Sequence, residues 1–386
     1  MEKYDTAVIG GGPIGGFVAG KIAEKNYKVI VFEKNKEIGI HVNCAGLVTQ
    51  RVFELANLPK KGIVQNEIKG ANIHSPSNKI VTIGGDKVHA LSIDREKFDQ
   101  EIIKKSEISG AEILTRTRVL SIHKNKNNFK LSTSEKKDYS CKILIGADGP
   151  YSKTREILSL TKPKEYLKGI GAEIVDVNLD PNYVEIFLGK EIAPGFFAWI
   201  IPTNKKGTNG RIGLCVNQKS TKSAKYYFSK FFKNDVFEGY LKGCTIEKNI
   251  GGVIPLGALK KTYADNAMLV GDAAAQVKPT SGGGIYPGLL CGMHCSNIAV
   301  KSLQKNDYSG NFLKKYQKLW EKDIGYELKR GMKFRTIYNT LSDKQLDKYI
   351  VKLQNPKIIE IINKYGDIDY PSKLVKPLIK KIPYLI

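Results

Sequence analysis

The sequence lacks several features that mark particular classes of protein. Among its 386 residues there is no apolar run long enough to span a bilayer. Its six cysteines include no C-x-x-C pair and have no histidines at metal-ligand spacing, so we expect no metal site. No secretory signal precedes the first apolar strand, which begins at residue 5. We therefore expect a cytoplasmic protein with reduced cysteines, and a peripheral position on the inner face of the cell membrane stays open.

Arginine is scarce, although the chain is strongly basic. The 62 lysine and arginine residues outnumber the 38 acidic residues and give a net charge of +24, but only eight of them are arginines. Base readout and bidentate phosphate contacts favour arginine, and the lysines are scattered along the chain. We therefore expect no nucleic-acid partner. A lysine-rich proteome, an acidic membrane surface and a phosphorylated substrate remain as explanations of the charge.

The first thirty-three residues predict a dinucleotide-binding unit. Residues 7–9 form an apolar run that is typical of a buried parallel strand, and a G-x-G-x-x-G turn follows it. The glycines of this turn are Gly10, Gly12 and Gly15. They allow the backbone to approach a pyrophosphate, and the helix that begins near Pro13 offers its N-terminal N–H groups to that anion. A second strand ends in Glu33, whose carboxylate can accept hydrogen bonds from ribose hydroxyls.

Two later apolar strands also end in glycine and aspartate. The strand over 141–147 leads into Asp148-Gly149, and the strand over 264–270 leads into Gly271-Asp272. Small residues and an acid at the carboxyl end of a strand suit contact with a dinucleotide, although an ordinary strand-to-helix turn has the same composition. A glycine run, residues 282–284, then precedes a helix expected over 289–303 and allows backbone N–H groups to meet a ligand closely.

The middle of the chain changes character. Residues 169–252 contain consecutive strands with one aromatic helix over 226–242, which predicts a separate, mostly antiparallel sheet. One strand, 194–202, is unusually aromatic, and both sheet core and an apolar substrate wall explain it. Helices are expected over 316–333, 342–354 and 356–364. The tail over 373–386 has four lysines and no acids, so it either docks on the protein or touches acidic lipid.

These strand ends together resemble the flavin-dependent group related to para-hydroxybenzoate hydroxylase. In that group the first glycine motif holds the ADP part of FAD, the Gly-Asp motif holds the ribityl chain and pyrophosphate, and the Asp-Gly motif supports FAD and a transient nicotinamide cofactor. The resemblance implies the second role for Gly271-Asp272 and the third for Asp148. Arg95, within Asp94-Arg95-x-x-Phe98-Asp99, matches a family arginine near the flavin.

Within that group the chain is most similar to the geranylgeranyl reductases, in particular the archaeal enzymes that saturate digeranylgeranylglycerophospholipids. Four features carry this likeness over roughly residues 1–320: Cys44-Ala45-Gly46, the strand Pro-Gly-Phe-Phe-Ala-Trp-Ile-Ile-Pro, Gly-Asp-Ala-Ala, and Lys-Pro-Thr-Ser-Gly-Gly-Gly-Ile-Tyr. The aromatic strand departs from the family pattern, because Ile201-Pro202-Thr203 stands where a Phe-Pro-Lys type ending is common.

The resemblance implies an α/β fold, α+β overall, with a Rossmann-like FAD-binding domain and a second, mostly antiparallel substrate domain. We expect the FAD-binding domain over 1–165 and 262–325, with a small β insertion near 69–90. The substrate domain is expected over 166–261 and a C-terminal helical segment over 326–386. The expected cofactor contacts are Gly10, Gly12, Pro13, Gly15, Glu33, Cys44, Ala45, Gly46, Arg95, Val119, Asp148, Gly149, Gly271, Asp272, Gly283, Gly284 and Ile285.

The implied reaction is saturation of an isoprenoid double bond by hydride from reduced flavin and a coupled proton. An unactivated alkene has no carbonyl to hold negative charge, so an acid must be positioned beside it. Cys44 is the first candidate for this acid and Tyr286 the second. The expected substrate contacts are Phe196, Phe197, Trp199 and Pro202. The electron donor is expected to be a transient NADPH or ferredoxin.

Two rival functions remain open from the sequence. A monooxygenase or epoxidase of an apolar substrate uses the same fold with O₂, because function belongs to the site and not to the fold. The charge of +24 also suits a membrane-surface or nucleic-acid binding protein that retains a flavin for structure.

Overall fold

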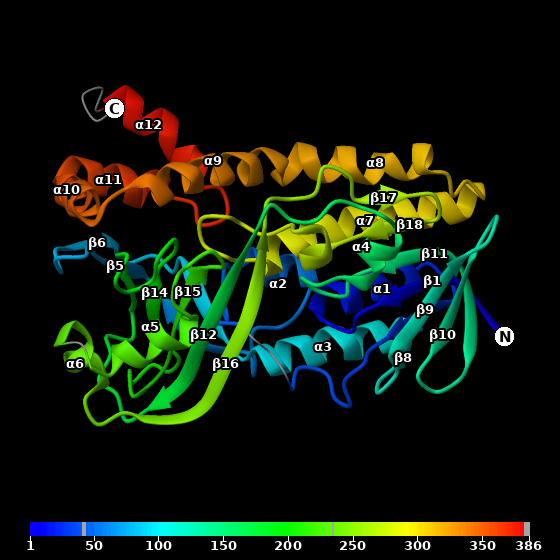
Figure 1. Cartoon of the computed structure of the whole chain (residues 1–386), viewed down its shortest axis with the longest axis horizontal. Helices are drawn as coiled ribbons and strands as arrows, with labels where there is room; N and C mark the ends of the chain where they lie inside the picture. The colour runs from blue at the N-terminus through cyan, green and yellow to red at the C-terminus, as the bar shows by residue number, and fades with distance from the viewer. Residues whose placement is uncertain (41–43, 234, 382–386) are drawn as a thin grey trace.

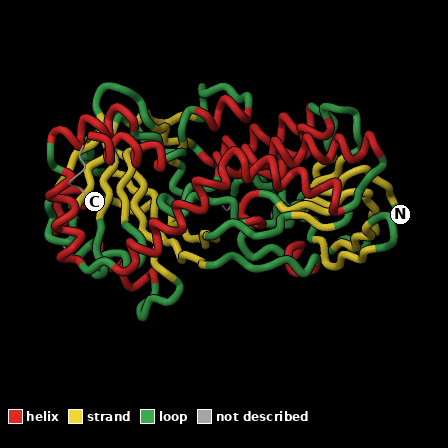
Figure 2. The backbone as a smooth tube through the Cα atoms, turned by 90° about the horizontal axis from the view of Figure 1, so that it is seen from above, coloured by secondary structure: helices red, strands yellow, loops and turns green. Residues whose placement is uncertain are grey.

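The computed structural model of the chain describes residues 1–40, 44–233 and 235–381. Figure 1 shows an elongated molecule in which two groups of strands lie side by side, with C-terminal helices along one long edge. Figure 2 shows the same two groups of strands from above, with long helices over the region between them. This mixed α/β architecture, with an eight-stranded and a seven-stranded sheet, confirms the predicted fold class.

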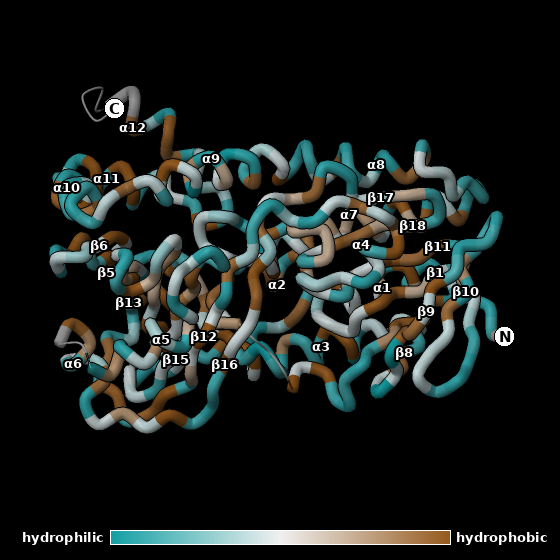
Figure 3. Tube along the Cα trace, viewed as in Figure 1, coloured by the Kyte–Doolittle hydropathy of each residue, from teal (hydrophilic) through white to brown (hydrophobic). Residues whose placement is uncertain are grey.

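The first sheet is built on five parallel strands in the order β18-β11-β1-β2-β8. These strands are β1 (Glu2–Ile9), β2 (Val29–Phe32), β8 (Glu112–Leu114), β11 (Asp138–Gly146) and β18 (Ala267–Leu269). The antiparallel strands β9 (Val119–Lys124), β10 (Phe129–Thr133) and β17 (Tyr263–Ala264) extend it. Figure 3 shows apolar chain around β1 and β11, as expected for strands that are covered on both faces.

Helices cover the first sheet and bring its strand ends together. Helix α1 (Pro13–Ala23) packs against α7 (Ile285–Lys305) and α3 (Arg95–Ile108). Asp94 caps α3 by accepting a hydrogen bond from the Lys97 N–H group. Two short elements, α4 (Lys153–Ile157) and η1 (Gly271–Ala274), are the next elements in the chain after β11 and β18. The strand ends that the sequence singled out therefore lie at one edge of one sheet.

The second sheet has the strand order β16-β12-β15-β14-β13-β5-β6. Its strands are β5 (Gly70–His74), β6 (Ile80–Gly84), β12 (Glu165–Val175), β13 (Tyr183–Phe187), β14 (Ala198–Pro202), β15 (Asn209–Asn217) and β16 (Thr245–Leu256). The hairpin β5–β6, which sequence analysis grouped with the first domain, joins this sheet because β5 pairs in parallel with β13. The predicted aromatic helix is two helices, α5 (Ala224–Phe231) and α6 (Asp235–Leu241).

A small sheet connects the two large ones. It consists of β3 (Leu47–Val48), β4 (Val64–Ile68) and β7 (Ala90–Ile93), and the short helix α2 (Arg51–Ala56) follows β3. Strand β7 runs into α3, so one segment links this small sheet to the helix that begins at Arg95.

The C-terminal part of the chain is helical, as Figure 1 shows. It comprises α8 (Gly310–Trp320), η2 (Glu321–Gly325), α9 (Tyr326–Thr340), α10 (Asp343–Leu353), α11 (Pro356–Tyr365), η3 (Pro371–Leu374) and α12 (Val375–Lys381). Ser342 forms a capping box with Gln345 at the start of α10. Among the described residues, no helix combines the length and apolarity that crossing a bilayer requires. Residues 382–386 of the basic tail lie outside the described part of the chain.

Candidate functional site

A cavity of about 590 Å³ lies where the two large sheets, the small sheet and the C-terminal segment meet. Its lining begins at the glycine turn after β1, passes Cys44 and Arg95, and ends at the aromatic strand β14. Lining residues also come from β16, from the loop before α7 and from residues 368–369. The cavity therefore joins the expected nucleotide-binding edge to the expected apolar wall.

The glycine turn has the geometry that an anion site requires. Gly10 has a φ of +107°, and a side chain there would overlap the carbonyl of Ala147. No side chain caps the N-terminus of α1, and a Cβ on Gly12 would meet no atom within 4 Å. Glu33 accepts a hydrogen bond from the Gly11 N–H group at 2.9 Å. Free helix N–H groups, open space and a carboxylate at the end of β2 fit a pyrophosphate and its ribose.

Asp272 lies on the cavity wall in the first turn of η1. Burial raises the pKa of Asp272 to about 6, although the charge of Arg95 opposes the shift. The carboxylate of Asp148 has partners within the protein: it accepts hydrogen bonds from Ser152 Oγ at 2.5 Å and from the Thr154 N–H group at 2.9 Å. Asp148 thus fixes the start of α4, and its neighbour Gly149 lines the cavity.

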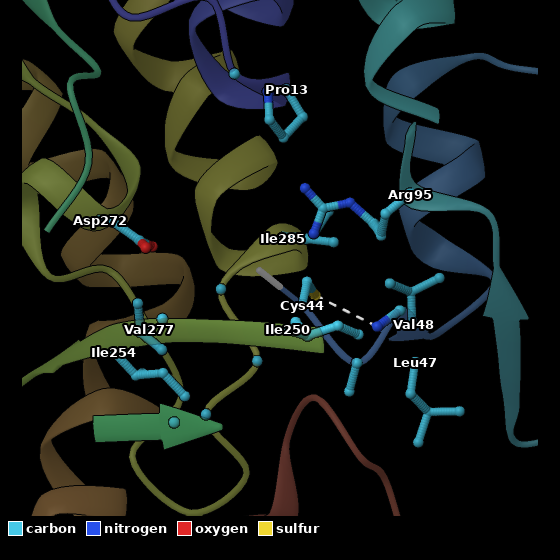
Figure 4. Close-up of a pocket in the computed structure, with 18 of the residues that line it drawn as sticks. Pro13, Cys44, Leu47, Val48, Arg95, Ile250, Ile254, Asp272, Val277 and Ile285 are labelled. Carbon is cyan, nitrogen blue, oxygen red and sulfur yellow. Dashed lines mark hydrogen bonds between the residues drawn. The ribbon is translucent and has the colours of Figure 1, made fainter. Parts of the chain in front are cut away.

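The side chains of Cys44 and Arg95 lie close together in the lining of the cavity. Figure 4 shows Cys44 below the Arg95 guanidinium, with Ile285 between them in this view. Cys44 Sγ accepts a hydrogen bond from the Gly46 N–H group at 3.4 Å, and Arg95 pairs with Asp99 at 3.0 Å. Burial lowers the pKa of Arg95, but contact with Asp99 and Cys44 outweighs burial and raises it. A permanent cation therefore stands beside the thiol.

Tyr286 also lines the cavity, in the first turn of α7. Its hydroxyl shares a hydrogen bond of 2.8 Å with the hydroxyl of Tyr370, which lies at the start of η3. Burial, reinforced by Tyr370, raises the pKa of Tyr286. A phenol whose pKa is raised holds its proton more tightly, which makes Tyr286 a weaker acid than an ordinary tyrosine.

The aromatic strand contributes three rings to the cavity. Phe196 and Phe197 stack at a centroid distance of 4.2 Å, and Trp199 meets Phe197 edge-on at 6.1 Å. All three line the cavity together with Ile201. The indole N–H group of Trp199 is buried within this wall and has no hydrogen-bond partner among the described residues.

Some predicted site residues lie outside the cavity lining. Gly10 shapes the turn from behind, and Asp148 caps α4. Val119 lies at the start of β9, next to the outer hairpin of the first sheet, and Pro202 ends β14 with its carbonyl toward Asn66. All other predicted residues line the cavity: Gly12, Pro13, Gly15, Glu33, Cys44, Ala45, Gly46, Arg95, Gly149, Gly271, Asp272, Gly283, Gly284, Ile285, Tyr286, Phe196, Phe197 and Trp199.

Three parts of the wall that the sequence did not predict carry polar or backbone groups of note. Residues 250–254 of β16 line it, as does Arg211 from β15. The third part is the loop at 368–369, where Asp369 binds Lys278 at 2.7 Å and Thr49 at 2.6 Å. Arg211 could have been found from the sequence, because it is a lone arginine in the apolar strand over 209–217. No local pattern marks the loop, because its partners lie far away in the sequence.

Comparison with known proteins gives consistent matches. A family model described as geranylgeranyl reductase catalytic domain matches residues 167–253. The chain is 32% identical to digeranylgeranylglycerophospholipid reductase of Methanocaldococcus jannaschii, and the alignment covers 100% of this chain and 97% of that protein. A structure described as geranylgeranyl bacteriochlorophyll reductase-like, from Thermoplasma acidophilum, aligns with a TM-score of 0.85 at 24% identity, covering 100% of this chain and 98% of that one. Halogenase PltM, solved with FAD, aligns with a TM-score of 0.72 at 13% identity, covering 98% and 90%.

Proposed function

The chain belongs to the geranylgeranyl reductase family and is a flavin-dependent oxidoreductase, and we propose that it saturates isoprenoid double bonds in a digeranylgeranyl-type precursor of membrane lipid. The observation that carries the proposal is that one cavity is lined by the glycine turn, by Cys44 and Arg95, and by the rings of Phe196, Phe197 and Trp199. A glycine turn that suits a dinucleotide, a thiol and an apolar wall around one cavity support the proposal.

FAD is the cofactor that these residues fit, and when bound and reduced it supplies the hydride. The N-terminus of α1 and the Gly12 turn hold its pyrophosphate, and Glu33 accepts from its adenosine ribose. Asp272, at the opposite end of the sheet edge, accepts hydrogen bonds from the hydroxyls of the cofactor. Asp272 takes this role in its ionised form, because a carboxylate that has lost its proton only accepts hydrogen bonds.

Cys44 donates the proton. The alkene has no heteroatom to hold negative charge, so the proton must arrive as the hydride does. The Cys44 S–H bond breaks as the new C–H bond forms, and the charge left on sulfur lies beside the cation of Arg95. Water that reaches the half-buried thiol returns its proton before the next double bond is reduced. Tyr286 is the alternative donor, handicapped by its raised pKa.

The rings of Phe196, Phe197 and Trp199 hold the isoprenoid chain and exclude water. Each buried CH₂ group contributes about 0.8 kcal/mol, so a long apolar tail gains much from this wall.

The reductant, NADPH or ferredoxin, visits transiently. The described strands carry one G-x-G-x-x-G turn, and that turn belongs to FAD in this proposal. A hydride or electron donor must therefore reach the cofactor through the cavity or its rim.

An acidic membrane surface is the proposed partner, and α9 is the face that meets it. Tyr326, Phe334 and Ile337 are 56%, 60% and 61% exposed and share one side of the helix with Arg330 and Lys333. Apolar side chains flanked by cations suit the surface of an anionic bilayer.

Cosedimentation of the protein with phosphatidylglycerol vesicles is expected to fall in the variant Phe334→Ser/Ile337→Ser. Ile108→Ser, which removes a 78% exposed side chain from α3, is the control and should bind as before.

The proposed activity is tested by anaerobic incubation of chemically reduced holoprotein with digeranylgeranyl lipid, followed by mass spectrometry. The expected product gains two hydrogen atoms for each double bond reduced and needs no O₂. A product that contains added oxygen and forms only in air would identify a monooxygenase or epoxidase instead. Purified protein without flavin absorbance would exclude both enzymes and favour a binding protein.

A further inference from the structure

Arg211 is a buried cation at the junction of the two halves of the molecule. It lies near the start of β15, is 5% exposed and lines the cavity. Its Nε atom donates to Glu173 Oε1 at 3.0 Å, and its Nη2 atom donates to Gln65 Oε1 at 2.9 Å. These two contacts fix the plane of the guanidinium group, which leaves Nη1 aimed at a third segment.

That third segment carries Cys44 and Arg95. Nη1 of Arg211 donates to the carbonyl of Ile93 at 2.9 Å and to the carbonyl of Ala45 at 3.3 Å. Ala45 is the residue after Cys44, and Ile93 lies two residues before Arg95. Nη1 of Arg211 therefore joins the backbone next to Cys44 to the backbone near Arg95.

The packing around this bridge leaves little freedom. Gly46 has a φ of +68°, and a side chain there would overlap Nη1 of Arg211. The Gly46 carbonyl in turn accepts from the Ile93 N–H group at 2.8 Å. The turn at residues 44–46 thus packs between β7 and the guanidinium of Arg211. Arg211 therefore sets the distance between this turn and Arg95.

Arg211 also ties this turn to the substrate wall. It pairs in register with Ile201 of β14, the strand that carries Trp199 and directly follows Phe197. The side chain crosses from the substrate sheet to the small sheet, so the wall that holds the lipid and the turn that holds the thiol share one rigid contact.

We propose that Arg211 is a positioning residue that holds the Cys44 thiol against Arg95 and in register with the substrate wall. The inference rests on the proposed function in one respect, namely that Cys44 donates the proton. Arg211 acts through the backbone of Ala45 and Ile93 and gives up no proton itself.

A double-mutant cycle between Arg211→Met and Cys44→Ala tests this role. Alone, Arg211→Met is expected to lower kcat at least tenfold with FAD content unchanged. In the Cys44→Ala background it should lower kcat less than twofold, because the group that it positions is gone. Equal fold losses in both backgrounds would overturn the proposal. Arg335→Met is the matched control: Arg335 is 3% exposed and pairs with Glu165, so any loss it causes should be the same in both backgrounds.

Alkylation of individual cysteines by iodoacetamide, quantified by peptide mass spectrometry, gives a readout that does not require turnover. Arg211→Met should change the rate at Cys44 at least threefold and leave the half-buried Cys244 unchanged, and Arg211→Lys should show a smaller change. An unchanged rate at Cys44 would overturn the proposal. If Cys44→Ala retains full kcat, the proton-donor role fails, while the alkylation rate still reports whether Arg211 holds the turn.

Discussion

Replacing Lys278 with methionine is expected to release the C-terminal loop from the cavity wall. The Lys278 and Asp369 side chains are 9% and 1% exposed and lie 2.7 Å apart. Removing one partner of a buried ion pair strands the other charge and costs about 3–5 kcal/mol. Asp369 keeps Arg51 at 3.1 Å and Thr49 at 2.6 Å, so we expect the lower end, about 3 kcal/mol.

Native-state hydrogen exchange measures this cost locally, which matters because a chain with two sheets need not unfold in one step. A loss of about 3 kcal/mol corresponds to about 100-fold faster exchange, and we expect it at the amides of residues 367–370. Asp369→Asn should do at least as much, since it strands Lys278. The variant with both changes should lose less than the sum, because neither charge is left alone. Unchanged exchange in the Lys278→Met variant, or strictly additive effects, would show that this ion pair does not hold the loop.

Three further predictions concern the cavity. The pKa of Asp272 is about 6 in the folded chain and near 3.8 when unfolded, so the neutral carboxyl stabilises the folded apoprotein by about 3 kcal/mol below pH 4, and this contribution is lost as the pH rises through 6. Asp272→Asn should therefore flatten the pH dependence of the apoprotein's Tm between pH 4 and 7. An unaltered slope would contradict the burial of this carboxyl. Cys44→Ala should lower kcat by about 10²–10⁴-fold with full FAD content, measured by single-turnover kinetics, whereas wild-type turnover would return Cys44 to a packing role. Gly15→Ala places a Cβ on the Gly10 carbonyl and should abolish FAD retention, read as the ratio of flavin to protein absorbance; normal occupancy would show that the turn can relax.

The sequence predicted the parts of the molecule that depend on local pattern. The apolar run of β1, its glycine turn and the Gly271-Asp272 strand end follow from spacing alone, and they lie together because parallel strands share one edge. Asp148, like Asp272, follows an apolar strand, but Ser152 and Thr154 donate hydrogen bonds to its carboxylate, a difference that only the geometry of α4 reveals.

Contacts between distant segments escaped sequence reasoning for a physical reason. The hairpin β5–β6 has its own alternating pattern, but which sheet it joins depends on pairing with β13, more than a hundred residues away. Asp369 meets Thr49 and Lys278, which also lie far from it in the sequence, and nothing in the polar stretch around Asp369 marks a cavity wall. Arg211 was detectable as a lone cation in an apolar strand, yet its partners were not.

Under the proposed function, lipid and not O₂ accepts the hydride in this cavity. Mixing the reduced holoprotein with digeranylgeranyl lipid under strict anaerobiosis tests this, while the visible absorbance of oxidised flavin and the mass of the lipid are followed. Flavin should be reoxidised only when lipid is present, and one double bond should gain two hydrogen atoms for each flavin reoxidised. Flavin that stays reduced with lipid and is reoxidised only by O₂ would contradict it.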